Sequence, residues 1–129
     1  MTDTNRVPAI RVTLLPKDTN WHGTVFGGVL LSQIDLAAAI ETRNHTRHRT
    51  VTVAMQEVEF KKPVFVGDVV SFYTRLIRRG RTSLTIHVDV EASRHDDPNT
   101  IVQVTQAVVI FVTVDADGNK CPVEHPFIE

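Results

Sequence analysis

The chain has 129 residues, of which 42% are hydrophobic and 22% are charged, and its formal net charge is -1. That length and hydrophobic content suit one domain with a substantial core, so we expect a single domain over residues 1–129. The small net charge gives no general electrostatic basis for binding nucleic acid or an anionic membrane, and any charge-based binding has to be local.

Few sequence features bear on cellular location. Cys121 is the only cysteine, which excludes a disulfide within the chain and suits a reducing compartment. The N-terminus lacks the basic segment and apolar run of a secretory signal, and no stretch approaches the length that spans a bilayer. We therefore expect a cytoplasmic protein with neither a membrane partner nor a nucleic-acid partner.

The N-terminal part of the chain predicts one short strand followed by one helix. Residues 10–15 are a strand candidate, and residues 16–25 are loop-like because proline, asparagine and glycine interrupt any regular pattern. Residues 27–43 lack proline, are rich in Leu and Ala in their later part, and show no strand alternation. They predict a helix of about four turns that ends near Asn44.

The remaining sequence predicts strands joined by short turns. We expect strands over residues 50–60, 69–77, 84–91 and 101–114. The last of these is apolar on both faces near its end, so we expect it to be central in the sheet. The tail from about residue 119 is expected to be irregular. Short turns make consecutive strands antiparallel neighbours.

These elements together predict an α+β domain with one helix and one five-stranded antiparallel sheet. The helix is apolar around most of its circumference, so either the sheet wraps around it or another subunit covers it. The pattern alone does not select one α+β arrangement among several.

Asp35 is the most informative residue of the predicted helix. It is the only charge in residues 29–40, and a carboxylate among apolar side chains is costly unless it is paired, hydrogen-bonded or protonated. Helical spacing places it in one stripe with Gly28, Ser32 and Ala39. This stripe of small and polar side chains leaves room for a thin substrate arm along the helix.

Gly27 and Gly28 begin the same helix. Glycines permit close approach of a ligand, and the free N–H groups of a helix start carry partial positive charge that suits an oxyanion. Asp35 lies about 10 Å further along the axis, which is long for one reaction centre. The distance predicts a site built across a dimer. Alternatively, Asp35 pairs with an arginine and the glycines form only a packing turn.

The segments around this helix resemble the acyl-CoA hydrolases of the YciA and brain-type cytosolic family. The most specific shared pattern is F-G-G-x-x-x-S-Q-x-D, from Phe26 to Asp35. The other shared runs are Asp18-Thr19-Asn20, Gly23-Thr24-Val25, Val51 to Ala54, Phe60 to Val64, Val66-Gly67-Asp68 and Gly80 to Ser83. The resemblance keeps this order from about residue 10 to about residue 115.

The resemblance implies a hotdog fold, in which a five-stranded antiparallel sheet wraps around one long central helix. It implies hydrolysis of acyl-CoA thioesters to CoA and a carboxylic acid, with no metal and no organic cofactor. The expected assembly is a homodimer with a continuous sheet, usually within a trimer of dimers. Asp35 falls on the family's catalytic aspartate, a general base or a nucleophile, and Gly27 and Gly28 fall on its oxyanion turn.

Thr24 departs from the resemblance, since many relatives carry Asp or Asn there. A threonine hydroxyl can hydrogen-bond but cannot act as a base, so we expect Thr24 only to orient other groups. Thr52 is expected on the strand that passes the site, where its hydroxyl can reach Asp35 or the substrate. The further candidates for substrate binding are Asn20, Phe26, Ser32, Val53, Lys62, Arg79, Gly80, Arg81, Thr82 and Ser83.

The basic candidates are expected to hold the phosphates of coenzyme A. The alternative is that they are solvated residues protecting the edges of the sheet. Two other functions stay open: a non-catalytic acyl-CoA-binding regulatory module, and an acyl-thioester dehydratase. Dehydratases with this fold usually pair a histidine with an acid, and the predicted helix has no histidine before His45. The six histidines offer no tight ligand set, so no metal site is expected.

Overall fold

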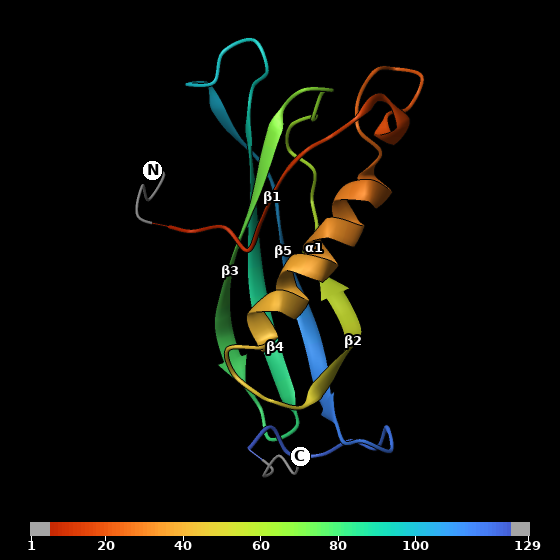
Figure 1. Cartoon of the computed structure of the whole chain (residues 1–129), viewed down its shortest axis with the longest axis vertical. Coiled ribbons are helices and arrows are strands. Elements are labelled where there is room, and N and C mark those ends of the chain that lie inside the picture. Colours follow the sequence, from red (N-terminus) through yellow and green to blue (C-terminus); the bar gives the residue numbers. More distant parts are fainter. Residues whose placement is uncertain (1–5, 125–129) are drawn as a thin grey trace.

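The computed structural model describes residues 6–124 and contains the predicted helix and five antiparallel strands. The elements are β1 (Ile10–Thr13), a short 3-10 helix (Pro16–Asp18), α1 (Gly27–Thr42), β2 (Arg49–Gln56), β3 (Val69–Arg79), β4 (Ser83–Ser93) and β5 (Ile101–Val114). The strands form one sheet in the order β1-β3-β4-β5-β2. The sheet curls around one side of α1, which confirms the predicted arrangement (Figure 1).

The core lies between α1 and the inner face of the sheet. Alternate residues of β4, from Leu84 to Val90, are completely buried, as the sequence alternation predicts. Ile86, Val88 and Val90 pack in the same core cluster as Ile34, Ala37 and Ala38 of α1. Burial of each large apolar side chain contributes about 1.5–3 kcal/mol, so this contact fixes the orientation of α1. The opposite side of the helix, including Leu36, stays exposed.

One prediction about the strands is confirmed and another is wrong. β5 is an interior strand, as predicted, because it pairs with β4 on one side and with β2 on the other, although β4 is the middle one of the five. Its outward residues Val108, Ile110 and Val112 are partly exposed. β2 ends at Gln56 rather than at residue 60, because Glu57 adopts the left-handed conformation with φ 59°, which stops strand pairing.

β2 is an edge strand. It pairs with β5 on one side and with no strand of the described chain on the other. The register shifts between Thr52 and Ala54, so Val53 lies in a bulge. Val51 is 48% exposed and Val53 is 56% exposed. An unpaired edge with exposed valines is suited to pairing with another chain.

Among the described residues, no helix is both long enough and apolar enough to cross a membrane. Residues 119–124 contain no helix and no strand beyond an isolated bridge between Val114 and Lys120. They are held against the sheet by backbone hydrogen bonds from Cys121 to Thr113 and from Val123 to Arg81. This segment therefore closes the end of the molecule near the turn between β3 and β4.

Candidate active site

Asp35 and Thr52 meet between α1 and β2. Thr52 pairs with the buried Phe111 in the β2–β5 ladder, so its side chain points toward α1. Its hydroxyl donates a hydrogen bond to Asp35 Oδ1 at an O–O distance of 2.7 Å. Within residues 6–124 Asp35 forms no ion pair, so the single chain gives no support to a purely structural pairing with an arginine. Asp35 Oδ2 accepts no hydrogen bond from any of the described residues.

Gly27 and Gly28 leave free backbone donors at the start of α1. The first hydrogen bonds of the helix come from the N–H groups of Val29 and Leu30, which both reach the Phe26 carbonyl. Phe26 provides no side-chain cap, so the Gly27 and Gly28 N–H groups have no acceptor among the described residues. A Cβ on Gly28 would meet nothing within 4 Å. These donors are therefore open to an approaching anionic oxygen.

Asn20 and Thr24 shape the loop that leads into α1. Asn20 Oδ1 accepts hydrogen bonds from the His22 N–H at 2.9 Å and from the N–H and hydroxyl of Thr24, each at 3.2 Å. Gly23 completes the turn with φ 81°, a left-handed conformation that glycine adopts at little cost. The structure therefore uses both side chains to hold the loop, and the substrate contact of Asn20 stays a prediction.

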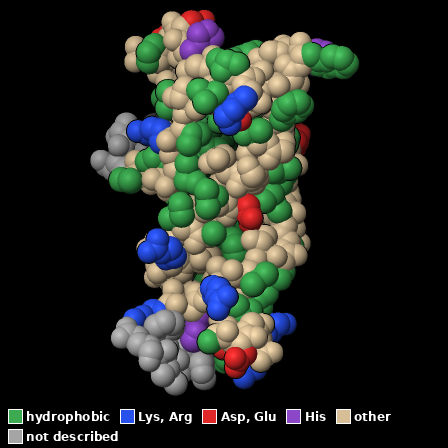
Figure 2. Space-filling view, turned by 45° about the vertical axis from the view of Figure 1, so that its right-hand side comes forward, with side chains coloured by type: hydrophobic (Ala, Val, Ile, Leu, Met, Phe, Trp, Pro, Cys, Tyr) green, Lys and Arg blue, Asp and Glu red, His purple; other side chains and the backbone are tan. Residues whose placement is uncertain are grey.

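An exposed apolar surface lies around Asp35, on the side where α1 and β2 meet. Ser32 adds little polarity to it, because its hydroxyl donates to the Val29 carbonyl at 2.8 Å. The large hydrophobic side chains exposed along these elements and the flanking segments are Phe26, Leu36, Ile40, Val51, Val53 and Phe60. Figure 2 shows hydrophobic side chains spread over this face with few acidic ones among them. Several large hydrophobic side chains exposed on one side of a molecule favour a role in binding or association.

The predicted phosphate-binding residues lie at two ends of the molecule. Lys62 is exposed in the segment after Phe60, whose ring lies 3.4 Å from where a Cβ on Gly27 would be. Residues 79–83 instead form the turn between β3 and β4, at the end away from the start of α1 (Figure 1). A single chain therefore does not bring this turn next to the Gly27 and Gly28 donors.

Arg79 and Arg81 differ within that turn. Arg79 donates hydrogen bonds to the His45 carbonyl at 2.9 Å and to the Glu124 carboxylate at 3.2 Å. Arg81 is exposed, and its side chain has no partner within the described residues. Of the two, Arg81 is the one whose guanidinium is available to a phosphate.

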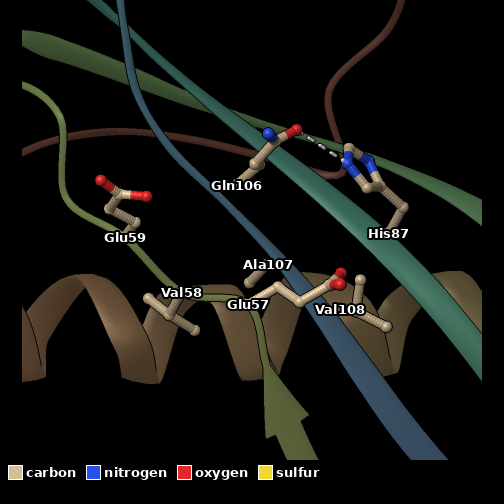
Figure 3. Close-up of a pocket in the computed structure, with 7 residues that line it drawn as sticks. All are labelled: Glu57, Val58, Glu59, His87, Gln106, Ala107 and Val108. Carbon is tan, nitrogen blue, oxygen red and sulfur yellow. Dashed lines mark hydrogen bonds between the residues drawn. The ribbon is translucent and has the colours of Figure 1, made fainter.

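A cavity of about 440 Å³ opens beside the end of β2, and Asp35 does not line it. Figure 3 shows His87 and Gln106 at one side of this cavity, joined by a hydrogen bond of 3.2 Å, with Glu57 just beyond the end of β2 and Glu59 further along the chain. None of the predicted site residues lines it. No group of three or more His, Cys, Asp or Glu in the described chain is arranged to hold a metal ion. The cavity is therefore separate from the candidate site.

Comparisons with known proteins agree with this fold. The family model of the thioesterase superfamily matches residues 22–98. The acyl-CoA thioester hydrolase YciA of Salmonella typhimurium is 38% identical over 115 residues, covering 88% of this chain and 86% of that protein.

Two solved structures are similar over nearly the whole chain. A hexameric hotdog fold thioesterase of Campylobacter jejuni has 41% identity and a TM-score of 0.87, covering 95% of this chain and 93% of that one. The hexameric thioesterase y2039 from Yersinia pestis has 36% identity and a TM-score of 0.86, covering 95% and 98%. The chain therefore belongs to the hotdog-fold thioesterase superfamily and is a relative of the YciA acyl-CoA thioester hydrolases.

Proposed function

We propose that this chain hydrolyses acyl-CoA thioesters to free CoA and a carboxylic acid. The placement of Asp35 carries the proposal: its carboxylate is oriented by one hydrogen bond from Thr52 and is set beside an exposed apolar surface. The comparisons support the same reaction, because the Salmonella relative is named an acyl-CoA thioester hydrolase and the Campylobacter relative a thioesterase.

Asp35 supplies either the base or the nucleophile. As a base, its carboxylate takes a proton from water while the water oxygen bonds to the thioester carbonyl carbon. As a nucleophile, Oδ2 attacks that carbon and forms a mixed anhydride, which water then hydrolyses. In both routes negative charge builds on the carbonyl oxygen, and the C–S bond then breaks to release the CoA thiolate. Neither route requires a metal ion or an organic cofactor.

The Gly27 and Gly28 N–H groups form the proposed oxyanion hole. Such donors have to lie about 3 Å from the developing oxyanion. Seven residues of helix separate Gly28 from Asp35, which places them about 10 Å apart along the axis. The donors and the carboxylate that act on one thioester therefore come from two different subunits.

The free edge of β2 gives a way to build this shared site. Two copies that pair their β2 strands antiparallel form one continuous sheet and place their α1 helices side by side in opposite directions. The start of one helix then lies beside the Asp35 half of the other. The relatives from Campylobacter and Yersinia are hexameric by name, and a trimer of such dimers fits this proposal.

The same arrangement places the substrate. The turn at residues 79–83 lies near the C-terminal end of α1, so pairing carries it toward the helix start of the partner. The phosphates of CoA then reach Arg81, and the pantetheine arm passes the bulge at Val53. The acyl chain lies on the apolar surface that includes Phe26. Thr24, already bonded to Asn20, orients the loop before the oxyanion hole.

Release of free CoA thiol from a panel of acyl-CoAs tests the proposed function. We expect turnover by the native protein and a loss of at least about a hundredfold in Asp35→Asn and Asp35→Ala. Asp117→Asn changes an exposed aspartate of a turn in the same way and is expected to leave turnover unchanged. Binding of acyl-CoA without thiol release would instead indicate the binding module, and water addition or loss without thiol release would indicate a dehydratase.

A further inference from the structure

The buried carboxylate of Asp68 is not used by the proposed reaction. Its side chain is completely buried just before β3. It accepts hydrogen bonds from the N–H groups of Phe65 and His95, each at 2.9 Å, and from Arg94 Nη1 at 2.8 Å. Burial alone would raise the pKa of Asp68, but these hydrogen bonds outweigh it and lower the pKa below its ordinary value. The carboxylate therefore stays ionised at neutral pH.

Arg94 connects Asp68 to the other end of segment 63–68. The same Nη1 that bonds Asp68 also donates to the Pro63 carbonyl at 2.9 Å. Its guanidinium lies over the Phe65 ring, 5.1 Å from the ring centroid. The side chain of Arg94 is only 15% exposed, so solvent does not compete strongly for these contacts. Asp68 and Arg94 together fix both ends of the segment.

Segment 63–68 in turn holds the chain just before the proposed oxyanion hole. The Val25 N–H donates to the Val64 carbonyl at 2.8 Å, and Thr24 forms an isolated bridge with Phe65. Val64 is 1% exposed and Val25 is 7% exposed, so this contact is part of the core. Val25 is two residues before Gly27, whose N–H is one of the two proposed donors.

We propose that Asp68 is a positioning residue, which sets the place of the Gly27 and Gly28 donors through Arg94 and segment 63–68. The inference rests on the proposed function. Donors of an oxyanion hole act only within a few tenths of an ångström of their best distance, and a shift of about 1 Å can cost about a hundredfold in rate. Loosening this segment would therefore lower the rate of the chemical step while the surfaces that bind CoA stay in place.

The test is Asp68→Asn, measured by kcat, by KM for acyl-CoA and by the affinity for CoA itself. Asparagine keeps the size of the side chain but turns an N–H₂ group toward donors that need an acceptor. We expect kcat to fall about tenfold or more, with KM and CoA affinity within about twofold of native values. Loss of folded protein alone would lower the number of CoA-binding sites per chain, which a titration with CoA counts, and would leave kcat per binding site at the native value, so the tenfold fall has to be seen in kcat per binding site.

Glu41→Gln is the matched control. Glu41 is also a hydrogen-bonded carboxylate of low exposure, but it lies at the other end of α1, where it accepts from Thr74 and His45. We expect this variant to lower Tm and to keep kcat within about twofold. If Asp68→Asn fails to fold, Arg94→Lys gives the same test, since it keeps the charge but loses the planar group that contacts Asp68, Pro63 and Phe65.

Two outcomes would overturn the inference. One is a folded Asp68→Asn or Arg94→Lys variant with native kcat, and the other is a Glu41→Gln variant whose kcat falls as far. In both cases the native protein still releases CoA, so the proposed function stands. If the native protein releases no CoA from any acyl-CoA, the proposed function fails and the inference fails with it.

Discussion

The hydroxyl of Thr52 and the carboxylate of Asp35 lie 2.7 Å apart, on two elements that face each other across the edge of the core. We expect Thr52→Val to lower kcat about tenfold, because one hydrogen bond that orients a charged group is lost. Thr52→Ser keeps the hydroxyl and should retain most of the activity. Thiol-release kinetics of both variants check this, and equal rates for Val and Ser would show that the hydrogen bond has no catalytic role.

Gly28→Ala should raise the stability of the protein slightly and lower its activity. Alanine is a better helix residue than glycine by about 0.5–1 kcal/mol, and its Cβ meets nothing within 4 Å in the chain. We therefore expect Tm to rise slightly. Activity should fall at least about tenfold, since the new methyl group stands where the thioester oxygen has to approach. A thermal melt measures the change in Tm, and steady-state kinetics measure the change in kcat/KM. Unchanged kcat/KM would show that the thioester oxygen does not approach the start of α1 at Gly28.

Arg81→Ala should weaken the binding of CoA phosphates. We expect KM for acyl-CoA to rise about fivefold to tenfold, with no change for an acyl-pantetheine substrate, which lacks the nucleotide. Arg75→Ala is the matched control, because Arg75 is exposed on β3 outside the predicted site. A rise in KM for both substrates, or the same rise in the Arg75 variant, would contradict a phosphate contact at Arg81.

Glu41 should contribute to the loss of stability in acid. Burial alone would raise the pKa of Glu41, but hydrogen bonds from Asn44, Thr74 and His45 lower it below its ordinary value. A carboxyl with a lowered pKa stabilises the fold above its unfolded-state pKa, and this contribution is lost as pH falls through the folded-state pKa. Glu41→Gln should therefore be less stable at pH 7 and lose less stability between pH 7 and about pH 3.

Urea unfolding at the two pH values measures this difference. The native protein and Glu41→Gln should approach each other in free energy of unfolding as the pH falls. A constant gap between them across the whole range would mean that the ionised form of Glu41 is not favoured by folding.

The sequence predicts those parts of the fold that depend on local patterns. α1 and β4 follow from the Leu and Ala content of one and the strict alternation of the other, and both are found where they are predicted. Asp35 was identifiable because a single charge in an apolar helix needs an explanation. The hydroxyl of Thr52 was identifiable as its partner, because the strand after a helix usually packs against it.

Other features depend on contacts between distant residues or on backbone conformation. The end of β2 depends on the left-handed conformation of Glu57, a residue type that does not indicate it. The place of β2 at the edge beside β5 depends on pairing between segments that are far apart in the sequence. The bond between Asp68 and Arg94 joins residues 26 apart, and only the folded sheet brings them together. Within one chain the turn at residues 79–83 and the glycine turn lie at different ends of the molecule, and no local pattern predicts how they are placed relative to each other.

A shared site can be tested by mixing two inactive variants. Asp35→Ala and Gly28→Leu are each expected to inactivate every site of their own dimers. Co-expression of the two chains therefore tests whether Asp35 and the glycine donors of one site come from one subunit or from two. If Asp35 and the glycine donors come from different subunits, each hybrid dimer contains one fully native site, and a random mixture should recover about a quarter of native activity. If both come from the same subunit, no hybrid contains a native site, and the mixture would stay as inactive as its parents.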